Sequence, residues 1–128
     1  MIQGKVWGTT EAIFALNNVE VHRIDIRSGG FSSRHRHAHK WNMFFIENGL
    51  LEITTWKANG VIDSTVLDRN ETTAIPPGEL HQFKALTNVV AYEIYWVSLN
   101  PDDILRESTG GCRKAPDPNA APPSDCPS

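Results

Sequence analysis

Cysteine is scarce in this 128-residue chain, which has only Cys112 and Cys126, both within its last seventeen residues. Two cysteines gathered at one end do not form the disulfide framework of a small secreted domain. Long apolar runs are also absent, since no stretch approaches the roughly 18 apolar residues of a membrane-spanning helix. The first residues, Met1 to Lys5, lead into no apolar signal segment. We therefore expect a cytoplasmic protein without a membrane segment.

An excess of positive charge is missing as well. Lys and Arg together number 12 against 15 Asp and Glu, which gives a formal net charge of −3. A protein that neutralises several phosphates of a nucleic acid needs a basic excess, so we expect no nucleic-acid partner. The length, with 40% hydrophobic residues, fits one domain with a single packed core.

The composition changes after Gly110 and Gly111. Residues 112–128 hold five of the eight prolines, mixed with Ala, Asp, Asn and Ser, and such a segment buries little apolar surface. We expect a folded domain over residues 1–110 and a disordered, proline-rich tail over residues 111–128. Just before the tail, residues 101–106 predict one helical turn capped by Asn100.

Short β-rich runs separated by turn residues make up most of the folded part, and no long helical period interrupts them. Asn59-Gly60 is the strongest hairpin signal. About eight to ten short strands with tight turns favour an all-β jelly-roll barrel. The strands that we expect cover residues 19–27, 41–46, 50–57, 61–67, 72–75, 81–86 and 89–98.

Four of the five histidines fall in two places. His35, His37 and His39 alternate along one segment, and His81 follows some forty residues later. Side chains at alternate positions of an extended segment share a face, so His35 and His37 can approach one metal ion from inside a barrel. An imidazole from a distant strand, His81, completes a facial set of three nitrogen ligands. His39 has the same parity and is the alternative ligand to His35.

These spacings resemble the two motifs of the cupin superfamily. The first motif, G-x5-H-x-H-x3-4-E-x6-G, is matched at every spacing by Gly29, His35, His37, Asn42 and Gly49, with Asn42 in place of Glu. The second, G-x5-P-x-G-x2-H-x3-N, keeps its register at Asn70, Pro76, Gly78, His81 and Ala85, with Ala85 in place of the final asparagine. Asn70 replaces a glycine here, and asparagine tolerates the left-handed backbone that glycine usually supplies.

Within that superfamily the chain looks most like the C-terminal cupin domain of bifunctional mannose-6-phosphate isomerases. The shared features are the four-residue spacer before Asn42, the aromatic run at residues 43–46, the segment 73–76 and the ending 102–106. The resemblance implies a cupin jelly-roll barrel that holds one divalent transition metal (Zn, Fe, Mn, Ni, Co or Cu). It also implies an isomerase or epimerase that acts on a sugar phosphate or sugar nucleotide.

Asn42 stands where that family has a metal-ligating carboxylate. Three neutral imidazoles leave the double charge of the metal uncompensated, so we expect a small anionic molecule as the ligand of the site. The amide oxygen of Asn42 would be at most a weak fourth ligand.

The strand at residues 89–98 carries the candidate catalytic groups. Either Tyr92 and Trp96 or Glu93 and Tyr95 face the interior. A buried Glu93 beside Tyr95 would be a candidate general base. Two further functions stay open: a three-histidine non-heme iron dioxygenase, and a cupin that binds a small molecule without catalysis.

A homodimer is the expected assembly. Apolar side chains that one short barrel does not cover favour self-association. The residues concerned are Trp7, Phe14, Met43 and Phe45. His22 has no motif around it and is interpreted as structural.

Overall fold

The computed structural model describes residues 1–97 and 102–112, and in this part of the chain it contains strands but no helix. The strands form a compact unit of residues 1–98. Their bounds are β1 Ile2–Lys5, β2 Gly8–Leu16, β3 Val19–Ile26, β4 Trp41–Asn48, β5 Leu51–Trp56, β6 Ile62–Leu67, β7 Thr72–Ile75, β8 Leu80–Ala85 and β9 Val89–Trp96. The expected all-β fold class is confirmed.

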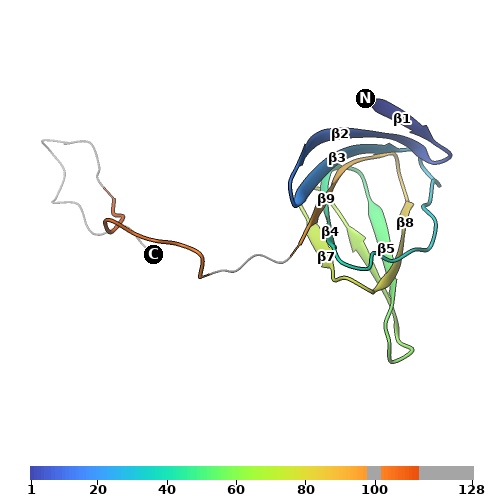
Figure 1. Ribbon diagram of the computed structural model, residues 1–128. Coiled ribbons are helices and arrows are strands. Elements are labelled where there is room, and N and C mark those ends of the chain that lie inside the picture. The colour runs from blue at the N-terminus through green and yellow to red at the C-terminus, as the bar shows by residue number, and fades with distance from the viewer. Residues whose placement is uncertain (98–101, 113–128) are drawn as a thin grey trace, which may run out of the picture. The chain divides into compact units, whose positions relative to one another are not determined.

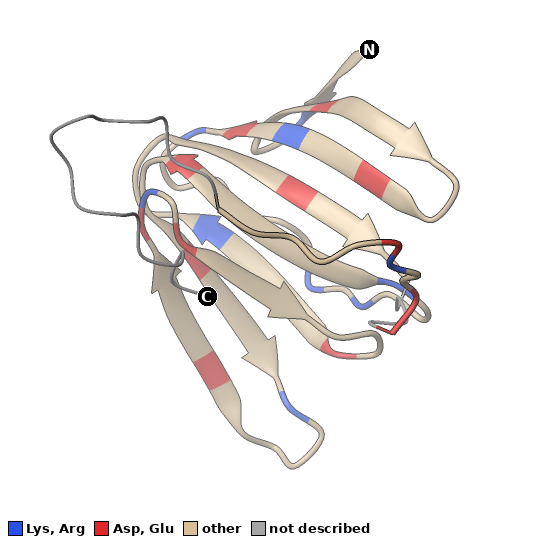
Figure 2. Ribbon diagram, turned by 90° about the vertical axis from the view of Figure 1, so that its left-hand side faces the viewer, with Lys and Arg blue, Asp and Glu red and all other residues tan. Residues whose placement is uncertain are grey.

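Two antiparallel sheets make up this unit. The larger has the strand order β1-β2-β3-β9-β4-β7 and the smaller has the order β6-β5-β8. Figure 1 shows the larger sheet curving around the smaller one, with β1 and β2 at its far edge. Acidic and basic residues are scattered along the strands (Figure 2).

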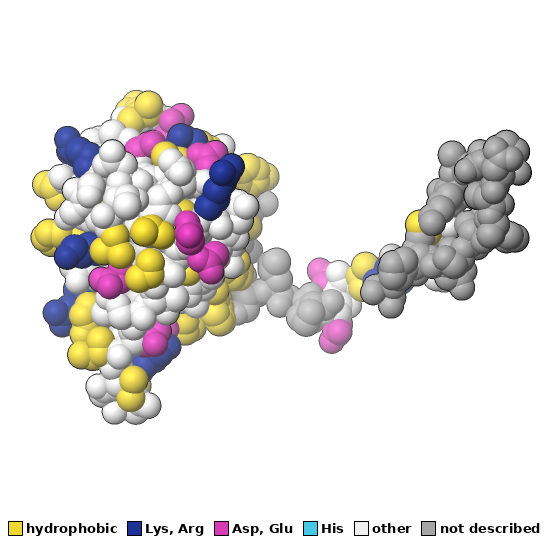
Figure 3. Space-filling view, turned by 180° about the vertical axis from the view of Figure 1, so that it is seen from behind, with side chains coloured by type: hydrophobic (Ala, Val, Ile, Leu, Met, Phe, Trp, Pro, Cys, Tyr) yellow, Lys and Arg dark blue, Asp and Glu magenta, His cyan; other side chains and the backbone are white. Residues whose placement is uncertain are grey.

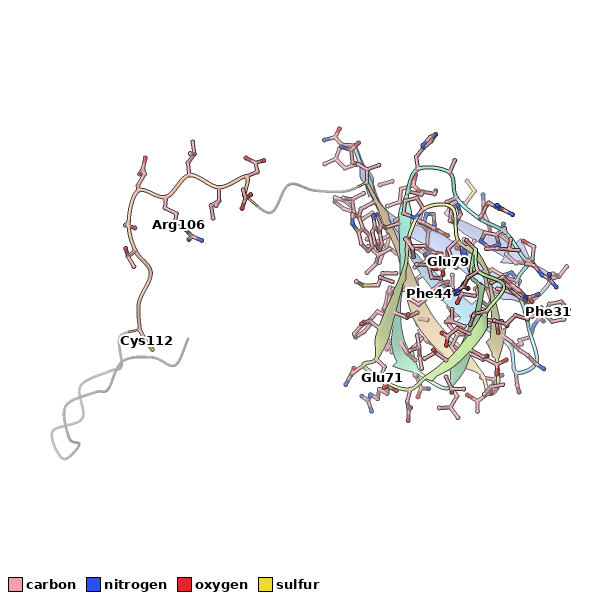
Figure 4. The ribbon with its side chains drawn as sticks, turned by 90° about the horizontal axis from the view of Figure 1, so that it is seen from below. Phe31, Phe44, Glu71, Glu79, Arg106 and Cys112 are labelled. Carbon is pink, nitrogen blue, oxygen red and sulfur yellow. The ribbon has the colours of Figure 1, made fainter. Side chains whose placement is uncertain are left out.

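The core lies between the sheets because inward-facing positions alternate with outward-facing ones along each strand. On β4, Asn42, Phe44 and Ile46 are buried while their neighbours are partly exposed. The ring of Phe44 on the larger sheet contacts that of Phe83 on the smaller one, with centroids 6.0 Å apart. Seen from below, Phe44 lies within the barrel and Phe31 at its outer side (Figure 4). Each fully buried side chain of this size stabilises the fold by about 1.5–3 kcal/mol.

The segment that joins β3 to β4 closes the barrel although it is not a regular strand. It runs beside β8, and its backbone forms hydrogen bonds along the length of that strand. The bonded pairs are Gly29 with Ala85, Ser32 with Phe83, and His35 with His81. The segment that leaves the larger sheet after β3 thus pairs with β8, the edge strand of the smaller sheet.

The motif glycines lie where the backbone is left-handed. The φ angles of Gly29, Gly49 and Gly78 are 84°, 97° and 84°. Asn70, which replaces a glycine, has a φ of 66°. The expectation that asparagine supplies this conformation here is confirmed.

Two strands and one turn differ from the expectations. β1 and β2 were not predicted, because residues 2–16 have no apolar alternation that points to a buried face. Residues 102–106 form no helix; the amide of Ile104 instead bonds the carbonyl of Asp102, two residues earlier. Asn100 and Pro101 lie outside the described residues.

The end of the chain is described in part. Residues 102–112 are exposed, and Cys112 is disulfide-bonded. Residues 113–128 lie outside the described residues, so the disordered tail and the domain boundary at residue 110 stay predictions. The described part of the chain has no helix long and apolar enough to cross a membrane.

The outer face of the larger sheet carries much of the apolar surface expected for a homodimer. Met43 and Phe45 lie on the outer side of β4, and Phe14 is 48% exposed on β2. Trp7 instead packs against the core, with its ring 5.1 Å from that of Phe83. Figure 3 shows hydrophobic side chains in groups between charged ones on the rear of the barrel. The dimer itself stays a prediction.

Replacement of Gly49 by Ala should destabilise the fold by about 3 kcal/mol, because a Cβ would collide with the carbonyl oxygen of Asn88 and the left-handed φ adds strain. Gly60→Ala is the matched control, since Gly60 has a φ of 85° but no atom lies within 4 Å of the place that a Cβ would take. It should cost only about 1 kcal/mol. Urea unfolding followed by tryptophan fluorescence measures both, and equal losses would contradict the steric explanation.

Candidate metal centre

Three histidines meet inside the barrel. His35 and His37 come from the segment that closes the barrel, and His81 comes from β8. One ring nitrogen of each lies within 4.8 Å of those of the other two. The backbone brings them together: the amide of His35 donates to the carbonyl of His81 at 3.0 Å, and the amide of His81 donates to that of His35 at 2.9 Å.

Backbone carbonyls orient two of the rings. Nδ1 of His35 lies 2.9 Å from the carbonyl oxygen of Ser33, and Nδ1 of His81 lies 2.9 Å from that of Glu79. A carbonyl only accepts hydrogen bonds, so each Nδ1 carries the proton and each Nε2 has a free lone pair. Histidines that bind metals are commonly held in this way by their second nitrogen.

Several buried polar atoms around the histidines have no partner among the described residues. They are Nε2 of His37, Nε2 of His81, Oδ1 of Asn42 and Oγ1 of Thr55. Thr55 lies directly across from His81 in the β5–β8 register. An unpaired buried polar group costs about 1–3 kcal/mol, so such a cluster calls for an ion or water. Imidazole nitrogens with free lone pairs fit a divalent transition metal.

Two of the three histidines, His37 and His81, favour the neutral form that binds a metal. Burial lowers the pKa of His37 to about 4, and the neighbouring charges of His35, Lys40 and His81 act in the same direction. Burial also lowers the pKa of His81. Near neutral pH neither ring has to lose a proton before it can bind a metal.

His39 and Asn42 occupy different environments. His39 is exposed, and the three-histidine group found among the described residues does not include it. Asn42 is 1% exposed on the inner face of β4, opposite Tyr95 of β9. Asn42 therefore points into the barrel. Its amide oxygen accepts no hydrogen bond from the residues that the structure describes.

Glu93 and Tyr95, rather than Tyr92 and Trp96, face the interior. In the β4–β9 register Glu93 lies opposite Phe44, and directly opposite residues share a face of the sheet. The hydroxyl of Tyr95 donates a hydrogen bond to Oε2 of Glu93. Burial raises the pKa of Glu93. Tyr92 lies on the other face, where its hydroxyl accepts a hydrogen bond from Arg23 at 3.1 Å.

A cavity of about 370 Å³ adjoins the histidine cluster. His35, Lys40, Glu93 and Tyr95 line it on the side of the cluster. The ammonium of Lys40 lies 4.1 Å from the centre of the Tyr95 ring. The rest of its polar wall comes from β1, β2, β3 and the segment after β3, through Gln3, Lys5, Thr10, Glu20, His22, Ser32 and Ser33. A volume of this size is typical of small-molecule sites.

Sequence reasoning missed the role of His22. It was interpreted as structural, yet it lines the cavity, and its ring meets that of Tyr95 edge-on with centroids 5.7 Å apart. Its Nε2 is 3.2 Å from Oε2 of Glu20. The alternation along β3 could have revealed this position, because His22 shares a face of the strand with the buried Ile24 and Ile26.

Glu79, whose side chain is 11% exposed, belongs to an ion pair. Its carboxylate lies 2.6 Å from Nζ of Lys57, while its carbonyl orients His81. Figure 4 shows Glu79 on the turn that leads into β8. Arg34 is exposed and stacks on the ring of Trp56 at 4.2 Å. These side chains do not take part in the cavity.

The structure is similar to solved cupin-fold proteins. KdgF from Halomonas sp. superimposes with a TM-score of 0.67 at 11% identity, over 77% of this chain and 89% of KdgF. Oxalate decarboxylase from Bacillus subtilis, described with Mn(II) centres, gives 0.70 at 13% identity, over 76% of this chain. An oxalate oxidase gives 0.58 at 21% identity, over 62% of this chain. This likeness shows that the chain has the cupin fold.

The likeness extends no further than the fold. The chain spans about a quarter of the oxalate decarboxylase, of which 27% is covered, and 42% of the oxalate oxidase. No protein-family model and no curated protein matches the chain. The finer resemblance to mannose-6-phosphate isomerases therefore stays a prediction.

The metal-free protein should lose stability as the pH falls from about 6.5 toward 4. Unfolded histidine has a pKa of about 6.5, whereas that of folded His37 is about 4. Between these values the unfolded chain binds a proton that the folded chain does not, so acid favours unfolding. Urea midpoints at pH 7 and pH 4.5 should differ less in His37→Gln than in the wild type. His39→Gln is the control and should keep the wild-type difference; a His37→Gln protein with an unchanged difference would contradict the assignment.

Proposed function

We propose that the protein binds one divalent transition metal through His35, His37 and His81, and that it holds a small anionic molecule in the adjoining cavity. The observation that carries this proposal is the pair of buried Nε2 atoms on His37 and His81, neither of which has a hydrogen-bond partner within residues 1–97 and 102–112. The Mn(II) centres of the similarly folded oxalate decarboxylase also support a divalent metal in this chain. When bound, the metal would act as a Lewis acid that polarises an oxygen of the ligand.

The charge of the site favours an anion. No carboxylate belongs to the three-histidine group in the described residues, and Asn42 contributes only a neutral amide. A divalent ion held by neutral ligands keeps its full charge, whereas a glutamate would cancel one unit. Lys40, which also lines the cavity, adds a positive charge. Imidazole ligands favour zinc, iron, nickel or copper over magnesium or calcium, and manganese and cobalt belong to the same candidate set.

Glu93 and Tyr95 would supply acid–base chemistry if the bound molecule reacts. The carboxylate of Glu93 faces the cavity and is held by the hydroxyl of Tyr95. A partly buried carboxylate with a raised pKa is suited to take and return a proton. This arrangement favours an isomerase or epimerase of a sugar phosphate or sugar nucleotide as the reaction. An iron-dependent dioxygenase is the alternative, and simple ligand binding requires no proton transfer at all.

The metal content of the purified protein tests the site. Elemental mass spectrometry should find close to one transition-metal ion per chain in the wild type and in His39→Ala. His81→Ala should lose most of the metal, because it removes a ligand whose ring is already oriented. Circular dichroism shows whether each variant is folded, and His35→Ala repeats the test from the other segment.

Two results would overturn this proposal. One is a folded wild-type protein that takes up none of zinc, manganese, iron, nickel, cobalt or copper after reconstitution. The other is a His39→Ala variant that loses as much metal as His81→Ala. With metal bound, conversion of a sugar phosphate that stops on chelation supports the isomerase, and oxygen uptake that requires ferrous iron supports the dioxygenase. Saturable binding without either supports a binding protein.

A further inference from the structure

Four side chains form a continuous polar block on the cavity wall. Glu20 and His22 lie on β3, and Tyr95 and Glu93 lie directly opposite them on β9. His22 bonds Glu20, and Tyr95 bonds Glu93. All four line the same cavity as His35 of the metal cluster. The block thus faces whatever molecule the metal holds.

The block offers mainly hydrogen-bond acceptors. The hydrogen bonds within it use Oε2 of Glu20 and Oε2 of Glu93, and each carboxylate has a second oxygen that accepts no hydrogen bond from the described residues. A carboxylate oxygen can only accept. The anionic group of a ligand is therefore repelled by the block and belongs beside the histidines and Lys40, whereas groups that donate hydrogen bonds belong against the block.

The rest of the polar wall consists of neutral side chains and one cation, Lys5 of β1. Gln3 on β1 and Thr10 on β2 line the cavity and lie opposite each other in the register of these strands. An amide and a hydroxyl both donate and accept. A hydroxyl group on the ligand has the same dual capacity, so it can pair with either kind of wall residue. An ammonium group can only donate. The carboxylates of Glu20 and Glu93 would attract it, but Lys5 of β1, which also lines the cavity, would repel it.

The size of the cavity excludes a very small ligand as its full occupant. At about 370 Å³ it extends from His35 to Gln3 and Thr10 on the outer strands. A two-carbon dicarboxylate bound at the histidines is too short to reach Glu20 and the outer strands, and it has no hydroxyl group to offer the acceptor block. A longer ligand with one carboxylate and several hydroxyl groups would fill the cavity, with the carboxylate at the histidines and the hydroxyl groups near the outer strands.

We infer that the ligand is a hydroxylated carboxylic acid, with its carboxylate at the three histidines and its hydroxyl groups against Glu20, His22 and Glu93. This inference rests on the proposed metal site and names the ligand class for it. Hydrogen bonds to charged groups typically change affinity by about tenfold or more when one partner is removed. The hydroxyl groups, rather than the carboxylate alone, should therefore dominate selectivity.

Isothermal titration with matched probes tests the inference. Gluconate and hexanoate have the same chain length and the same charge and differ in their hydroxyl groups. Gluconate should bind the metal-loaded protein at least tenfold more tightly than hexanoate. Oxalate tests the small dicarboxylate, and 6-aminohexanoate tests the ammonium alternative; both should bind more weakly than gluconate.

Two variants locate the preference on the block. Glu20→Gln and His22→Phe should each weaken gluconate binding by about tenfold and leave hexanoate binding unchanged. Glu47→Gln is the matched control: Glu47 is 49% exposed and pairs with Arg23 at 3.3 Å, much as Glu20 is 48% exposed and pairs with His22 at 3.2 Å. It lies outside the cavity lining and should bind gluconate as the wild type does.

The outcomes separate this inference from the metal proposal. The inference is overturned if gluconate binds no more tightly than hexanoate, if oxalate or 6-aminohexanoate binds more tightly than gluconate, or if Glu20→Gln and Glu47→Gln behave alike. Metal content, measured on the same samples, decides the metal proposal independently. The gluconate-to-hexanoate ratio is also measured on metal-free protein by tryptophan fluorescence, so failure to take up metal does not leave the hydroxyl preference untested.

Discussion

The reciprocal pair of backbone hydrogen bonds between His35 and His81 is the interaction on which the site depends. It fixes the irregular segment after β3 to β8, so that a chain leaving the larger sheet completes the smaller one. The same bonds bring together two distant segments of the sequence, one with the imidazoles of His35 and His37 and the other with that of His81. Closure of the barrel and assembly of the candidate metal site are therefore one structural event.

The parts that could be predicted from the sequence are those encoded by short spacings. Gly29, Gly49 and Asn70 mark left-handed turns because few residues adopt positive φ, and their φ angles agree. His35 and His37 share a face because they alternate, and His81 follows a turn with Gly78 that positions it. Each of these signals is local. Only the meeting of His81 with His35 and His37 is a long-range expectation, and the resemblance to cupins supplied it.

The remaining parts depend on neighbours that lie far away in the sequence. Whether Glu93 or Tyr92 faces inward follows from the register of β9 against β4, which alternation alone leaves undecided. β1 and β2 reach the cavity through polar residues such as Gln3 and Thr10, so they lack the apolar period that reveals a strand. The place of His22 in the cavity wall is not evident from the sequence for the same reason: it depends on Glu93 opposite on β9, and no motif surrounds His22.

The polar interior of so small a barrel also links metal binding to folding. His37, His81, Asn42 and Thr55 each bury an atom without a partner among the described residues, and every such atom opposes folding of the metal-free chain. An ion that binds only the folded chain offsets this cost by mass action. In the proposed site the three imidazoles and Asn42 are neutral, so a bound anion would balance part of the charge of the metal. Occupation of the cavity and stability of the fold are thus expected to rise together, which is how a barrel with a modest apolar core can retain a buried cluster of histidines.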